Sequence, residues 1–210
     1  MIMEHEKHFR KSMGTENVGP LLRTLVQMIR PQRILEVGAG YTTPFLLDGL
    51  KANEEIFDEG NLDPSYKKWH ESNNDPRLVV IDTDPLPQLD SKYVEHIQGK
   101  FQGRSQELFD KYGEFDMVWF DCGSLDTFQH FQQAFWPLVN SNGGLILIHS
   151  LATNFHGQMF LAELKLAQAT NAFNDFEIMT LIEPHKLWQN SITCIRLIGG
   201  LQTRINSLMP

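Results

Sequence analysis

Long apolar runs, cysteines and positive charge are all scarce in this 210-residue sequence. No stretch approaches the ~18 consecutive apolar residues of a membrane span, and the N-terminal MIMEHEKHFRKSMG lacks the apolar core of a signal peptide. The two cysteines, Cys122 and Cys194, do not have the spacing of a metal-binding motif. These absences predict a reduced, soluble, cytoplasmic protein with no membrane contact.

The charge balance limits the kinds of partner. Lysine and arginine number 18 against 26 aspartates and glutamates, which gives a formal net charge of −8. Such a chain is repelled by phosphate backbones, so nucleic acid is not an expected partner. The length and ordinary globular composition predict one domain over residues 1–210. The sequence leaves open whether two copies form a homodimer.

The most informative stretch is ILEVGAGYTT, residues 34–43. Its apolar start is typical of a strand buried on both faces, and Gly38 and Gly40 follow at once, where the missing Cβ lets a ligand approach the backbone. Thr42 or Thr43 can cap a helix that begins at the next proline. Strand, glycine turn and helix together predict a nucleoside cofactor site, with an ordinary turn as the alternative.

Strands and helices alternate along the rest of the chain. The N-terminal helical segment covers residues 1–30, and Pro31 ends its apolar periodicity. Apolar runs predict strands over residues 34–37, 78–81, 94–98, 115–120, 145–148, 176–182 and 192–198. The last two are joined closely enough to form an antiparallel pair. The pattern predicts a three-layer α/β fold with a mostly parallel seven-stranded sheet and an antiparallel C-terminal hairpin strand.

Two segments have open interpretations. Thr15, Glu16 and Asn17 precede the first helix and either cap it or contact a ligand. Residues 51–76 form a polar, acidic insertion that is long for a connection inside a domain. A lid over the substrate and a solvated loop are both compatible with that length.

Asp82 follows the second predicted strand and is a candidate ligand of a ribose. A carboxylate accepts hydrogen bonds from both hydroxyls of a ribose, and in dinucleotide folds it lies ~20 residues after the glycines. Removal of the 51–76 insertion would bring Asp82 close to that separation from Gly40. The alternative is that Asp82 only caps the turn before Pro85.

With these motifs in order, the sequence resembles the class I S-adenosylmethionine-dependent methyltransferases over nearly its whole length. ILEVGAG looks like the first motif of that family, VVIDTDP is similar to the second, and FDMVWFD and GGLILIHS look like its fourth- and fifth-strand motifs. The leading helix TENVGPLLRTLVQMIRP is similar to that of small-molecule O-methyltransferases of the catechol and caffeoyl-CoA type.

The resemblance implies S-adenosyl-L-methionine as cofactor and a set of residues around it. Gly38 and Gly40 would line the methionine part, Glu36 would organise the turn, and Asp82 would take the ribose hydroxyls. The region from Gly99 to Gln102 would border the adenine. The implied cofactor-binding residues are Glu36, Gly38, Ala39, Gly40, Asp82, Thr83, Gly99, Phe101 and Asp121.

The sequence departs from the metal-dependent members of the family. Their fourth strand ends in an Asp near a second acid and their fifth in Asp-Asn, whereas this chain has CGS after Asp121, and His149 and Ser150 at the fifth strand. Mg²⁺ prefers oxygen ligands, so we expect no metal site. A softer ion between Asp121 and His149 is the alternative.

His149 and Asp121 are the candidate catalytic residues. A neutral imidazole at a strand end suits a general base, although a structural histidine fits the same position. His156, His185 and Trp188 are further residues that either approach the substrate or decorate loops.

The predicted function is methyl transfer to an oxygen or nitrogen of a small molecule. An NAD(P)-dependent oxidoreductase is one alternative. Its nucleotide-binding turn typically has the motif GxGxxG, whereas Thr43 occupies the position of the last glycine here. A non-catalytic module that binds S-adenosylmethionine is the other.

Overall fold

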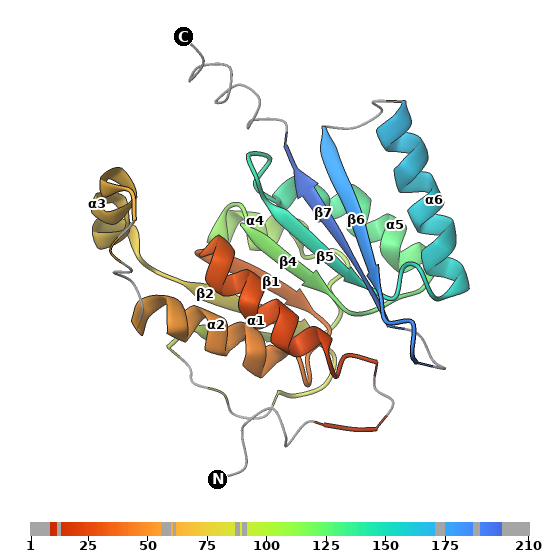
Figure 1. The fold of residues 1–210 in the computed structure, drawn as a ribbon, viewed down its shortest axis with the longest axis horizontal. Helices are drawn as coiled ribbons and strands as arrows, with labels where there is room; N and C mark the ends of the chain where they lie inside the picture. The colour runs from red at the N-terminus through yellow and green to blue at the C-terminus, as the bar shows by residue number, and fades with distance from the viewer. Residues whose placement is uncertain are drawn as a thin grey trace.

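A seven-stranded sheet organises the fold (Figure 1). The computed structural model describes residues 9–11, 14–55, 60, 62–86, 89, 92–170, 175–186 and 190–198. The strands are β1 (Arg33–Val37), β2 (Arg77–Asp82), β3 (Val94–Gln98), β4 (Met117–Phe120), β5 (Leu145–His149), β6 (Phe176–Ile182) and β7 (Ser191–Leu197). Their order is β3-β2-β1-β4-β5-β7-β6, and β7 runs antiparallel to both of its neighbours. The predicted sheet, including its antiparallel C-terminal hairpin strand, is confirmed.

Helices cover both faces of the sheet, which gives the predicted three layers. On one face lie α1 (Val18–Ile29) and α2 (Thr43–Glu55), side by side in Figure 1. On the other face lie α4 (Ser105–Tyr112), α5 (Leu125–Ala134) and α6 (Phe155–Ala169). Within the part of the chain that the structure describes, no helix is both long and apolar enough to cross a membrane.

The strand β1 shows how the apolar run specifies the middle layer. Ile34 packs with the side chains of α1 and α2, whereas Leu35 and Val37 pack with those of α4, α5 and α6. A strand covered on both faces needs apolar residues at successive positions, and these three are nearly or fully buried. Glu36 is polar yet fully buried on the α1 and α2 side. A buried carboxyl group in the middle layer requires a specific partner.

The polar segment 51–76 is more ordered than a loop. Its first residues complete α2, and Pro64–Asn73 form α3 with Asp63 as the N-cap. The chain then enters the amino end of β2, where the Asp75 amide donates to Gln32 Oε1 just before β1. Ligands of open α/β sheets bind at the carboxyl ends of the strands. The described part of this segment lies at the opposite edge, where it leads into the amino end of β2.

The strand boundaries lie within one residue of those expected except in β4. The strand β4 begins at Met117, because Phe115 forms an isolated bridge instead of continuing the strand. The helix α6 begins at Phe155, where the Asn154 side chain accepts a hydrogen bond of 2.6 Å from the Gly157 amide and caps the helix. Side-chain capping therefore sets this boundary.

We predict that Gly49→Ala destabilises the fold. An added Cβ on Gly49 would lie 2.7 Å from Val26 Cβ and 3.1 Å from the Arg23 carbonyl oxygen, so α1 would have to move away from α2. Overpacking of this kind typically costs ~1–3 kcal/mol, and urea unfolding measures it. The matched control is Asp48→Ala, at an exposed position of the same helix. Equal stability of the two variants would contradict the prediction.

Candidate functional site

The glycine turn after β1 lets two strand ends meet. Gly38 has a φ of 93°, and an added Cβ there would lie 2.5 Å from the Asp121 carbonyl oxygen at the end of β4. The Gly38 amide donates to the Ile81 carbonyl at 3.0 Å, and the Asp121 amide donates to the Val37 carbonyl at 2.8 Å. These contacts bring the carboxyl ends of β1, β2 and β4 together. A side chain at position 38 would separate them.

Below the turn, a buried chain of hydrogen bonds holds Glu36. Trp119 Nε1 donates to Thr42 Oγ1 at 3.1 Å, and the Thr42 hydroxyl donates to Glu36 Oε1 at 2.9 Å. Glu36 Oε2 is buried without a hydrogen-bond partner. Burial raises the pKa of Glu36 to about 8, and the charges of Asp121 and Asp82 contribute in the same direction. Glu36 is therefore neutral near pH 7 and is linked to the turn through the Thr42 hydroxyl.

The second half of the turn is fixed by Thr43. Gly40 has a φ of 154° and its amide donates to Thr43 Oγ1 at 3.1 Å. Thr43 is the first residue of α2, so its hydroxyl ties the helix start to the glycine turn. Thr42, the other expected cap, uses its hydroxyl on Glu36 instead.

Asp82 caps the turns on both sides of the end of β2. Its Oδ2 accepts a hydrogen bond of 2.6 Å from the Ala39 amide, and its Oδ1 accepts one of 2.7 Å from the Asp84 amide. The capping interpretation of Asp82 is thus observed. Because each carboxylate oxygen has a second lone pair, both oxygens keep the capacity to accept from a ligand hydroxyl.

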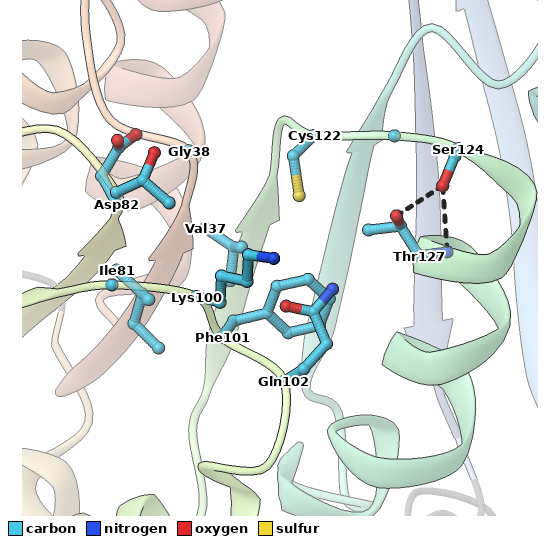
Figure 2. Close-up of a pocket in the computed structure, with 13 residues that line it drawn as sticks. Val37, Gly38, Ile81, Asp82, Lys100, Phe101, Gln102, Cys122, Ser124 and Thr127 are labelled. Carbon is cyan, nitrogen blue, oxygen red and sulfur yellow. Dashed lines mark hydrogen bonds between the residues drawn. The ribbon is translucent and has the colours of Figure 1, made fainter.

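A cavity of about 340 Å³ opens beside Asp82 (Figure 2). This volume lies within the range of small-molecule sites. The cavity is lined by Val37, Gly38, Ile81, Asp82, Thr83, Gly99, Lys100, Phe101, Gln102, Cys122, Gly123, Ser124 and Thr127. The loops after β1, β2, β3 and β4 therefore contribute to one concave site.

The implied cofactor residues are placed unevenly around this cavity. Gly38, Asp82, Thr83 and Gly99 line it directly. Phe101 also lines it, but its ring is buried and packs edge-on against Phe120 and Phe135, with centroids 5.4 and 5.1 Å away. The remaining implied residues, Glu36, Ala39, Gly40 and Asp121, do not line it. The role of Phe101 in packing is thus established by its contacts.

The start of α5 adds two polar residues to the cavity wall, of which Thr127 was not expected. The Ser124 and Thr127 hydroxyl oxygens lie 2.7 Å apart, and Ser124 Oγ accepts from the Thr127 amide as the N-cap of α5 (Figure 2). A serine directly before a helix was the available signal. Cys122 faces the same cavity, and burial raises the pKa of its thiol to about 12, so it stays protonated at neutral pH.

His149 and Asp121 form a pair at the ends of β5 and β4. Asp121 Oδ1 lies 2.7 Å from His149 Nδ1, and the Gly14 carbonyl oxygen lies 3.3 Å from Nε2. Burial alone would lower the pKa of His149, but the hydrogen bond and the charge of Asp121 outweigh it and raise the pKa above its usual value. Both ring nitrogens face oxygen acceptors, so this arrangement favours the imidazolium form.

The other candidate histidines take no part in this pair. His156 and His185 are exposed, and Trp188 lies outside the described residues. Among the residues that the structure does describe, no three histidine, cysteine, aspartate or glutamate side chains are grouped to hold a metal ion. The carboxylate of Asp121 instead binds a histidine nitrogen.

Comparison with solved structures decides the fold type. An O-methyltransferase from Bacillus cereus, in complex with SAH, superposes with a TM-score of 0.60 at 16% identity, covering 90% of this chain and 83% of that chain. The O-methyltransferase TomG from Streptomyces achromogenes, in complex with SAM, gives a TM-score of 0.58 at 19% identity, covering 87% and 80%. The chain has the Rossmann-like methyltransferase fold.

The strand order separates this methyltransferase fold from the dinucleotide-binding fold. Dinucleotide-binding folds have the order 3-2-1-4-5-6, whereas here the antiparallel β7 lies between β5 and β6. The alternative of an NAD(P)-dependent oxidoreductase thus loses its structural basis. No family model and no curated protein matches the sequence.

We predict that Glu36→Gln changes how stability depends on pH. The carboxyl pKa is raised in the folded state, so wild-type stability should fall as the pH rises from about 4.5 to about 8, because the unfolded chain releases this proton first. Glutamine can still accept from Thr42 and does not titrate. Between about pH 5 and pH 8, the variant should gain more than ~1 kcal/mol relative to wild type in urea unfolding. A constant difference between the two proteins would contradict the prediction.

Proposed function

We propose that this protein binds S-adenosyl-L-methionine in the cavity and transfers its methyl group to an oxygen or nitrogen of a small molecule. The observation that carries the proposal is the meeting of Gly38, Asp82 and Gly99 around one cavity at the carboxyl ends of β1, β2 and β3. Ligands of open α/β sheets bind at this edge. The Bacillus cereus and Streptomyces structures with the same fold are complexes with SAH and SAM.

The residues of the cavity fit such a cofactor. Gly38 lets the methionine part approach the backbone, and Asp82 accepts hydrogen bonds from the ribose hydroxyls while it keeps its own turn contacts. The loop from Gly99 to Gln102 borders the adenine, as proposed from the sequence. When bound, the cofactor supplies an electrophilic methyl group on sulfur.

The acceptor side is formed by His149 and Asp121. Asp121 fixes the ring by holding Nδ1–H, which leaves Nε2 as the atom that takes a proton from the acceptor hydroxyl or amine. Asp121 also stabilises the imidazolium that results. Alignment of donor and acceptor and exclusion of water would supply most of the rate enhancement.

The charges and the free thiols support a small-molecule acceptor, a reaction that needs no metal ion, and a reducing compartment. The net charge of −8 disfavours nucleic acid as the acceptor. Asp121 is already committed to His149, and histidine with one carboxylate is a poor site for Mg²⁺. Cys122 and Cys194 are free thiols, which fits the cytoplasm. The acceptor is accordingly proposed to be a small molecule of the cytoplasm.

We predict that Asp82→Ala weakens S-adenosylmethionine binding at least fivefold in calorimetry. The loss of charge-assisted hydrogen bonds to the ribose costs more than ~1 kcal/mol. Asp84→Ala is the matched control, because only the backbone of Asp84 contacts Asp82. Equal affinity in both variants would remove the ribose assignment. Absence of binding in the wild type would remove the cofactor, whereas binding without turnover on any acceptor would indicate a sensing module.

We also predict the pH dependence of the reaction. The base must be neutral and its pKa is raised, so kcat/KM should increase with pH through a midpoint above 6.5. Asp121→Asn removes the charge that raises the pKa and should move the midpoint to lower pH. His149→Ala should lower kcat at least ~10-fold. A midpoint that stays in place in Asp121→Asn would assign the base role to another group.

A further inference from the structure

Residues 14–17, which we call the strap, lie against the Nε2 edge of the His149 ring. The Gly14 carbonyl oxygen is 3.3 Å from His149 Nε2. Gly14 has a φ of 89°, and an added Cβ would lie 3.0 Å from Asn190 Oδ1 and 3.3 Å from His149 Cε1. The strap, the imidazole and the Asn190 amide therefore converge on one point. Glycine at position 14 makes this close approach feasible.

Asn190 places an acceptor atom beside the imidazole of His149. It directly precedes β7 and is 1% exposed. Its Nδ2 donates to Glu183, whereas its buried Oδ1 makes no well-formed hydrogen bond and interacts only with the His149 ring, whose pKa it helps to raise. A buried carbonyl oxygen without a well-aligned donor is costly and can still accept a hydrogen bond from a ligand. The atom lies where a ligand that displaced Gly14 would meet it.

Polar contacts with the connection between β6 and β7 hold the strap in place. Lys186 Nζ lies 2.6 Å from Glu16 and 3.0 Å from Glu183. Asn17 Nδ2 also donates to Glu183 and makes no cap bond to α1, so the capping expectation is wrong for this side chain. These ion-pair side chains are each between a fifth and a third exposed. Partly exposed ion pairs are weak enough to open and re-form.

We infer that the methyl acceptor binds beneath this strap, against His149 Nε2 and Asn190 Oδ1, and that Lys186 holds the strap closed until the acceptor enters. The inference rests on the proposed methyltransferase function and adds a specificity-determining residue to it. An acceptor hydroxyl or amine at this point donates to groups that now face Gly14. Entry of the acceptor also displaces the Gly14 carbonyl, which holds the Nε2 proton. The imidazolium can then lose that proton to solvent, and the neutral Nε2 takes the proton of the acceptor hydroxyl or amine.

Chemical labelling tests the strap without knowledge of the acceptor. Diethyl pyrocarbonate acylates neutral imidazole, and peptide mass spectrometry reads each histidine separately. In wild type, His149 should react at least tenfold more slowly than the exposed His156. Lys186→Met should speed labelling of His149 at least threefold and leave His156 unchanged, and Glu16→Gln should act in the same way. The control Lys165→Met alters an exposed lysine of α6 and should match wild type.

Equal rates of His149 labelling in wild type, Lys186→Met and Glu16→Gln would overturn the inference that the strap covers His149. If Lys186→Met does not fold by circular dichroism, Glu16→Gln carries the test by itself. A His149 rate in wild type equal to that of His156 also overturns the inference, because the strap would then not cover the ring.

Asn190→Leu tests the acceptor position, with Asn17→Leu as a control that loses the same kind of bond to Glu183. Transfer from labelled S-adenosylmethionine is measured on a panel of phenols and primary amines. Asn190→Leu should raise the acceptor KM at least tenfold with the S-adenosylmethionine KM unchanged, and Asn17→Leu should not raise it. An unchanged acceptor KM in Asn190→Leu overturns the inference.

Calorimetry with S-adenosylhomocysteine separates the two levels of failure. Absence of binding refutes the proposed function, while the labelling result still decides whether the strap gates His149. Binding without turnover of any panel member by wild type refutes methyl transfer and, with it, the acceptor site. Turnover by wild type with an unchanged acceptor KM in Asn190→Leu refutes the acceptor site alone.

Discussion

The close approach of Gly38 to the Asp121 carbonyl oxygen is the contact on which the rest of the site depends. It brings the ends of β1 and β4 together, and the hydrogen bond from Gly38 to Ile81 adds β2. The cavity, the carboxylate of Asp82 and the pair of Asp121 with His149 all lie at these strand ends. The positions of the Asp82 and Asp121 carboxyl groups thus depend on the backbone, because a side chain at position 38 would push the strand ends apart.

Three acids crowd this edge, and the structure treats each differently. Glu36 is buried and neutral, Asp82 accepts from two backbone amides, and Asp121 pairs with His149. Like charges at close range disfavour one another's ionisation, so the three acids have different environments. The result is an edge that presents the carboxyl groups of Asp82 and Asp121 in front of the buried Glu36.

Local patterns predicted the sheet well because its central strands β2, β4 and β5 are largely apolar runs with turn signals behind them. They also found Asp82 and the pair of Asp121 and His149, which lie at strand ends. They failed where distant contacts decide. Asn17 looked like a helix cap but binds Glu183, the residue after β6, and the polar surface of α3 gave no sign that it lies at the amino ends of the strands. Such contacts have no sequence signature.

The turn that follows β4 contributes to both halves of the site. Asp121 holds His149 on one side, and Cys122, Gly123 and Ser124, which follow it, line the cavity on the other. A ligand in either half would therefore bias the same few backbone atoms. By thermodynamic linkage, if one ligand changes the affinity for the other by some factor, the second changes the affinity for the first by the same factor. Any coupling between ligands of the two halves would therefore pass through the turn after β4 and act equally in both directions.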